Sequence, residues 1–282
     1  MKNVIKFLFL LSIVPGLFNA KENTQQTPKG YVLNSQSSVS SKYGRIHTDK
    51  QINFADKTST DPVKKLRQAS LPSSYSAVEA GYITSVKNQN PYGTCWAFAA
   101  SAASEASLIK NNGFDKNSIN LSELHLAYFT YNNSYDELGL LSGDSFTITS
   151  DSYLEYGGIN YNSMLSYARW TGPADEGKNT KYSYSNANKS FKAASTSDAY
   201  SLTEAHLKNC YIIDTSNISL MKQMILEYGA GDFGYYHDEN DRYFNDTYDS
   251  YCYVQSVDTS SNRFNWANHE VTVVGWDDNF SR

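Results

Sequence analysis

The sequence predicts an α+β protein with two subdomains, the first mostly helical and the second mostly strand. Residues 95–110 and the stretch that begins near 122 carry the apolar spacing, caps and terminators of helices. From residue 233 onward, short runs rich in β-branched and aromatic side chains are typical of strands. We expect the functional site in a cleft between the two subdomains.

The first twenty residues predict a secretory signal peptide. Lys2 and Lys6 precede a short apolar run over 7–18, which Pro15-Gly16 interrupts, and Ala20 is a small residue suited to cleavage. The run is too short and too broken to predict a membrane span, and no second long apolar segment follows. We therefore expect an exported protein without an integral membrane segment.

Residues 21–70 are rich in Lys, Gln, Ser, Thr and Asn, and they show no sustained hydrophobic period. Two interpretations stay open, a flexible linker or a pro-segment that masks an active site. The position directly after a leader favours the pro-segment. Ordered structure is predicted from Leu71-Pro72, so that residues 71–282 form the globular domain.

The charge pattern argues against binding to nucleic acid. The formal net charge is -5, and no basic block occurs in the 282 residues. The run 229–234 matches GxGxxG, but it follows a predicted helix and leads into a strand, which is the reverse of a nucleotide-binding site. Histidine and cysteine spacing does not predict zinc, and we expect no metal or other cofactor.

The helix predicted over 95–110 places a cysteine at its first turn. The turn residues Pro91-Tyr92-Gly93 precede it, and Asn111-Asn112-Gly113 is a good terminus. A second helix is expected to begin at Asn120 or Ser122, either of which can cap it. Two more helices are predicted, near 163–170 and over 219–228. Three strands are predicted after them, over 233–236, 251–257 and 269–276.

Three cysteines in an exported chain suggest one disulfide and one free thiol. The count alone leaves open which of Cys95, Cys210 and Cys252 is free. A helix amino terminus lowers the pKa of a thiol, so Cys95 is a candidate nucleophile, although a buried inert cysteine is an equally good interpretation of its local features.

A nucleophilic cysteine needs a histidine as its base. Among five histidines, His269 heads the alternating segment 270–274, and a strand end holds a base firmly. The other four are less suitable: His125 reads as a packed or surface residue, His237 as a solvated loop residue, His206 lies in a polar stretch, and His47 falls in the predicted pro-segment.

Several segments in order resemble papain-like (C1 family) cysteine peptidases. The segment 86–98 is similar to the family's active-site segment, and 268–276 to its histidine strand. The others resemble the start of the mature enzyme, the helix after the nucleophile helix and the paired glycines of the substrate cleft: 71–75, 121–123 and Gly157-Gly158. The resemblance implies a papain-like two-subdomain fold with a barrel-like second half.

This resemblance implies roles for particular residues. Cys95 would be the nucleophile, His269 its base, and Gln89 would complete the oxyanion hole with the backbone N–H of Cys95. Trp96 would pack the nucleophile helix into the cleft wall. The paired glycines Gly157 and Gly158 would let a peptide lie along the backbone. Glu270 would wall the pocket for the second residue before the cut, unless its side chain turns to solvent.

The chain departs from the family in two places. Tyr92 stands where the family usually has a disulfide-bonded cysteine, so we expect a different bridge between Cys210 and Cys252, as in bacterial surface members. No Asn-Ser-Trp segment follows His269, and Asn279 comes too soon to replace its catalytic asparagine. We therefore expect a C-terminally incomplete domain, with possible surface attachment through absent regions.

The favoured function is a secreted or surface cysteine endopeptidase that acts on proteins or peptides and is made as a zymogen. Two alternatives stay open. A catalytically impaired binding module on the same fold would fit the missing asparagine, but it need not keep Gln89, Cys95 and His269. A transglutaminase-like acyl transferase uses similar chemistry, and Gln89 and Gly157-Gly158 argue against it.

Overall fold

The computed structural model describes residues 7–15, 70–132, 153–214, 216–238, 242–253 and 267–280, and it gives residues 7–15 as backbone only. The predicted pro-segment, with His47, lies outside the described residues apart from residue 70. Among the described helices, none combines the length and apolar character that crossing a bilayer requires.

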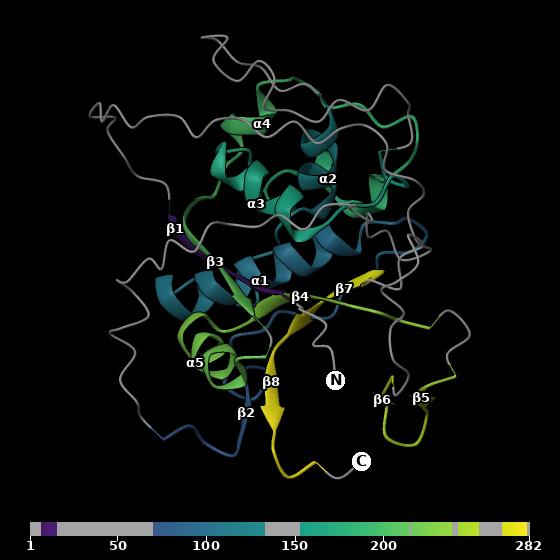
Figure 1. The fold of residues 1–282 in the computed structure, drawn as a ribbon. Coiled ribbons are helices and arrows are strands. Elements are labelled where there is room, and N and C mark those ends of the chain that lie inside the picture. Colours follow the sequence, from purple (N-terminus) through teal and green to yellow (C-terminus); the bar gives the residue numbers. More distant parts are fainter. Residues whose placement is uncertain are drawn as a thin grey trace.

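Helix α1 (Cys95–Asn112) runs through the middle of the molecule (Figure 1). Its buried face consists largely of alanine and serine, so neighbouring elements approach the helix closely on several sides. The helix ends at Gly113, whose φ of 71° lets its N–H bond to the carbonyl of Leu108. The predicted helix and its terminus are therefore confirmed.

A helical layer covers one side of α1 (Figure 1). It contains α2 (Glu123–Tyr131), α3 (Asn160–Ala168) and the short α4 (Asp198–Ser201). Ser122, one of the two predicted caps, accepts a hydrogen bond from the backbone of His125 at 2.9 Å. Aromatic and aliphatic side chains fill the core between this layer and α1, among them Trp96, Phe129 and Tyr182.

An antiparallel sheet lies on the other side of α1, with strand order β3-β1-β4-β7. These strands are β1 (Phe7–Pro15), β3 (Ala205–Asp214), β4 (Gly231–Tyr235) and β7 (His269–Val273). Part of the predicted leader therefore forms a strand, β1, which lies between β3 and β4 and pairs with both.

The remaining elements close the second half. Helix α5 (Ile218–Tyr228) connects β3 to β4, and its Met224 and Ile225 form a second small core with Ile213. β2 (Ser74–Ser76) pairs with β8 (Gly275–Asp277), which ties two segments far apart in the sequence to each other. β5 (Phe244–Asn245) and β6 (Ser250–Tyr251) form a hairpin.

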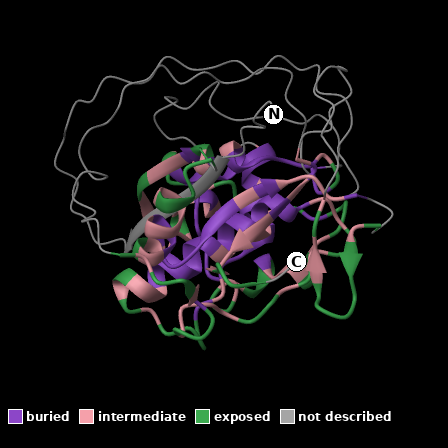
Figure 2. Ribbon diagram, turned by 60° about the horizontal axis from the view of Figure 1, so that its bottom comes forward, coloured by how far each residue is buried: buried purple, intermediate pink, exposed green. Residues whose placement is uncertain are grey.

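Buried residues gather along α1 and in the helical layer beside it, whereas β3 and β7 are mostly half-buried (Figure 2). The expected division into a helical first half and a strand-rich second half is confirmed. The prediction missed β3, where Lys208 and Asn209 are exposed and interrupt the apolar pattern. Pairing with β1 along the whole strand, rather than local apolar alternation, defines it.

Candidate active site

Cys95 is the first residue of α1 and is fully buried. Thr94 occupies the cap position, but its side chain makes no capping bond to the helix. The amino end of a helix carries a partial positive charge, and it is a common place for a nucleophilic cysteine.

A tyrosine from another part of the chain supports the loop before Cys95. The Tyr184 hydroxyl donates to the Gln89 carbonyl at 2.7 Å and lies 2.6 Å from the Thr94 hydroxyl. The Gln89 side-chain amide donates to the carbonyl of Tyr92 at 3.1 Å. The Tyr184 ring packs edge-on against Phe98, with ring centroids 4.7 Å apart. Both ends of the loop are thus tied to one phenol.

His269 is the first residue of β7 and lies directly opposite Tyr235 of β4. The two rings are 5.7 Å apart at their centroids. His237 lies near them as well, with its ring centroid 6.2 Å from that of His269. It is a loop residue, as the sequence predicted, but it is partly buried rather than solvated, because Tyr251 stacks on its ring at 4.7 Å.

Strand β7, which begins at His269, packs against helix α1, which begins at Cys95, and the Thr272 hydroxyl donates to the Ala99 carbonyl at 3.2 Å. Burial raises the pKa of Tyr131 well above its usual value, and the nearby groups Tyr156, Glu270 and Cys95 add to this. The Tyr131 hydroxyl therefore lies within electrostatic range of both Cys95 and Glu270.

The paired glycines and Trp96 have internal packing roles. A Cβ on Gly158 would lie only 2.5 Å from the Trp96 indole, so glycine is the residue that fits there. Gly157 has a φ of 80°, and its carbonyl accepts the hydroxyl of Tyr131. All three are buried. Their contact with a substrate stays a prediction.

Glu270 is buried, with an exposed fraction of 2%. Its carboxylate accepts a hydrogen bond from the backbone N–H of Asn160 at 3.1 Å, at the first turn of α3. The alternative in which Glu270 turns to solvent is therefore wrong. The side chain joins the two halves of the molecule beside His269.

Cys210 and Cys252 are not joined by a disulfide, which corrects the expected bridge between them. Cys210 lies within β3, where burial and the nearby Asp232 raise its pKa. Cys252 is exposed just after β6, at the separate β5–β6 hairpin. The number of cysteines in a sequence does not show where each one lies in the fold, so it could not predict whether Cys210 and Cys252 are close enough to bond.

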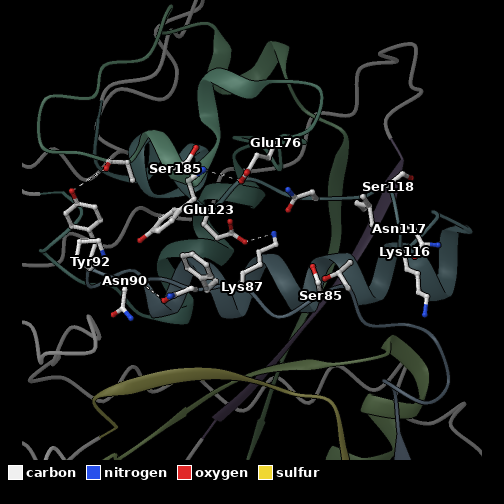
Figure 3. Close-up of a pocket in the computed structure, with 18 residues that line it drawn as sticks. Ser85, Lys87, Asn90, Tyr92, Lys116, Asn117, Ser118, Glu123, Glu176 and Ser185 are labelled. Atoms are coloured by element: carbon white, nitrogen blue, oxygen red, sulfur yellow. Dashed lines mark hydrogen bonds and ion pairs between the residues drawn. The ribbon is translucent and has the colours of Figure 1, made fainter.

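Sequence reasoning missed a buried charge cluster below the nucleophile loop. The Lys87 ammonium lies 2.9 Å from Glu105 and 2.8 Å from Glu123, and Figure 3 shows Lys87 and Glu123 directed toward each other. Burial raises the pKa of Glu123 to about 7 against the opposing effect of Lys87, and Glu105 raises it further. The available signal was Glu105, a charged residue among small apolar ones on α1.

The same cluster borders a pocket of about 760 Å³ on the helical side (Figure 3). The pocket is lined by the segment before Cys95, by residues 116–120 and by side chains that include Phe98, Glu176 and Tyr184. It lies behind the nucleophile loop, and its lining includes neither Cys95 nor His269. Its position was not foreseen from the sequence.

Comparisons with known proteins agree with this architecture. The family model described as papain family cysteine protease matches residues 71–281. The cysteine protease and lectin-like domains of Cwp84, a surface layer associated protein of Clostridium difficile, are 23% identical with a TM-score of 0.52, covering 74% of this chain and 40% of that one.

Recombinant stem bromelain precursor is 22% identical with a TM-score of 0.50, covering 73% of this chain and 55% of that one. Digestive procathepsin L 3 of Tenebrio molitor larval midgut is 17% identical with a TM-score of 0.47, and the match covers 75% of this chain and 57% of that one. The chain thus matches little more than half, or less, of each of these structures. Because the family model spans well over half of the chain, the protein belongs to the papain family of cysteine proteases.

Proposed function

We propose that this protein is a secreted cysteine endopeptidase, made as a zymogen, in which Cys95 is the nucleophile and His269 the general base. The main support is the packing of α1, which begins at Cys95, against β7, which begins at His269. The family match supports the same chemistry. The apolar leader pattern and the polar segment 21–70 support export and a zymogen.

In the proposed reaction, His269 takes the proton of the Cys95 thiol, and the thiolate attacks the carbonyl carbon of the scissile bond. The Gln89 amide and the Cys95 backbone N–H stabilise the oxyanion. His269 then gives its proton to the leaving amine, and a thioester forms. Water, deprotonated by His269, attacks the thioester and releases the acid and the free thiol.

The substrate class that we propose is protein or peptide, with no nucleic acid partner and no cofactor. The surface-layer association of Cwp84 supports a secreted or surface location for this chain, with attachment through regions outside it. The two rival functions, a binding module and an acyl transferase, predict different products and are separated by the experiment below.

The test measures hydrolysis of a fluorogenic peptide by the full chain and its variants. Cys95→Ala and His269→Ala should both fall to background, because each removes a reacting group, while the circular dichroism spectrum is kept. The matched control Cys252→Ala removes an exposed thiol and should retain full activity. Hydrolysis by Cys95→Ala at the wild-type rate contradicts the proposal. New peptide ends indicate a peptidase, and incorporated amine indicates a transferase.

A further inference from the structure

The β5–β6 hairpin, residues 242–253, projects from the rest of the molecule (Figures 1 and 2). Its base is bonded to the segment that follows β4. The Tyr251 hydroxyl accepts the Asp238 N–H at 2.8 Å and donates to the Tyr236 carbonyl at 3.2 Å. Arg242 donates to both carboxylate oxygens of Asp238, at 3.2 and 2.7 Å. The hairpin therefore has a fixed base, whereas its tip, residues 244–249, is exposed throughout.

The base of the hairpin adjoins the proposed general base. The Tyr251 ring stacks on His237 with centroids 4.7 Å apart, and the His237 ring lies 6.2 Å from that of His269. Tyr235, which lies opposite His269 in the β4–β7 register, has its ring 5.7 Å from that of Tyr251. An extended polypeptide spans about 3.3 Å per residue, so a substrate held at His269 needs only a few further residues to reach the hairpin.

The tip combines exposed rings with exposed carboxylates. Phe244 and Tyr248 are 42% and 68% exposed, and Asp246 and Asp249 lie between and beside them in the sequence. Within the described part of the chain, neither aspartate forms an ion pair. The one basic residue of the hairpin, Arg242, is already paired at its base. Ring faces and carboxylates both attract ammonium and guanidinium groups, so the tip is suited to a cationic partner.

We propose that the tip of the β5–β6 hairpin is a docking surface for the protein substrate, and that it binds a substrate segment in which lysine or arginine side chains accompany aromatic or apolar ones. The inference rests on the proposed function, because the segment belongs to the chain that Cys95 and His269 would cleave. The contact of the hairpin base with the site favours the substrate as the occupant, and the two aspartates favour a cationic segment of it.

This docking surface should select long substrates rather than particular bonds. A short peptide that occupies only the residues around Cys95 and His269 does not extend to the tip, so its cleavage should not depend on the hairpin. A longer chain gains a second contact that is the same before and during the reaction. Such uniform binding lowers KM and leaves kcat unchanged.

The experiment uses three fluorogenic peptides with one cleavage sequence. The first is short, the second is extended at both ends by about ten residues of alternating lysine and tyrosine, and the third has glutamate in place of lysine. At low salt, wild type should have a KM about fivefold lower for the lysine-extended peptide than for the short one. In Asp246→Asn/Asp249→Asn and in Phe244→Ser/Tyr248→Ser, this advantage should fall to about twofold or less, with kcat unchanged.

The matched control is Glu79→Gln/Glu227→Gln, which removes two exposed carboxylates from other parts of the fold and should keep the full advantage. Equal KM values of wild type for the lysine- and glutamate-extended peptides overturn the proposal. An undiminished advantage in either hairpin variant also overturns it. If the hairpin variants do not fold, salt decides: about 0.5 M NaCl should at least halve the wild-type advantage, and an unchanged advantage overturns the proposal.

A separate binding measurement distinguishes failure of the docking surface from failure of the proposed function. If wild type cleaves none of the three peptides, the proposed function fails. Fluorescence anisotropy then follows binding of the labelled lysine-extended peptide to Cys95→Ala protein, with and without Asp246→Asn/Asp249→Asn. The hairpin substitutions should weaken this binding about threefold or more, and equal binding overturns the docking surface.

Discussion

The hydroxyl of Tyr184 donates a hydrogen bond of 2.7 Å to the backbone carbonyl of Gln89, across a separation of 95 residues in the sequence. The same hydroxyl lies 2.6 Å from Thr94, the residue before Cys95. One side chain thus holds the residue proposed for the oxyanion hole and the cap of the nucleophile helix in a fixed relation.

Tyr184→Phe should therefore lower kcat about tenfold with little change in KM. Removal of an oxyanion-hole donor lowers kcat by about 10²–10³-fold, and loosening such a donor should cause a smaller loss of the same kind. Steady-state kinetics on a peptide substrate measure both constants. Tyr182→Phe is a matched control, because it loses a bond of 2.6 Å to Asp198 away from the nucleophile loop. An unchanged kcat in Tyr184→Phe contradicts the prediction.

Glu123 should make the folded state less stable as the pH rises. Its pKa is raised from 4.5 to about 7, chiefly by burial, so the folded protein binds a proton that the unfolded chain lacks between these values. The unfolding free energy should fall with pH in this window, by roughly 1 kcal/mol per pH unit. Urea unfolding of wild type and Glu123→Gln from pH 4 to 8 tests this, and equal slopes for both contradict it.

His125 should act in the opposite direction. Burial lowers its pKa from 6.5 to about 4, against the effect of Asp198. The neutral ring lies 2.9 Å from the Asp198 carbonyl, and a protonated ring would bury a charge. Its contribution is present above pH 6.5 and is lost as the pH falls toward 4, by roughly 1 kcal/mol per unit. In His125→Asn this acid-dependent loss should disappear from urea unfolding curves, although the variant is less stable at neutral pH.

Gly158→Ala should destabilise the protein by about 1–3 kcal/mol, because the new methyl group overlaps the Trp96 indole. The melting temperature, measured by calorimetry, should fall by several degrees. Gly81→Ala is a useful control: its φ of 80° strains an alanine through the backbone alone, because the added carbon meets no atom within 4 Å. A smaller fall for Gly158→Ala than for Gly81→Ala would show that Trp96 moves aside without cost.

The proposed role of Glu270 in substrate preference can be separated from its structural role. If its buried carboxylate borders the pocket for the second residue before the cut, Glu270→Gln should reduce a preference for Lys or Arg there by about tenfold. The glutamine oxygen can still accept the Asn160 N–H, so stability should change little. A peptide library read by mass spectrometry measures the preference. An unaltered preference leaves Glu270 with the structural link to α3 alone.

Local signals in the sequence determined the helices around the candidate site, and they supplied Cys95 and His269 as its predicted reacting residues. Ser122 caps α2 and Gly113 ends α1 because caps and left-handed turns depend on residues within a few positions. The active-site segment and the histidine strand are likewise short, and they carry the family resemblance that the family match confirms. The sequence by itself therefore indicated the fold class and the papain family.

Only the tertiary structure decided which distant residues meet. It joined Lys87 to Glu105 and Glu123, Tyr184 to Gln89, and Glu270 to α3, and it separated the two cysteines that were expected to pair. It also moved His237 from an expected solvated loop to the neighbourhood of His269. Such contacts depend on how the chain closes over long separations and on which side chains the core can bury, and neither is encoded in any short stretch of sequence.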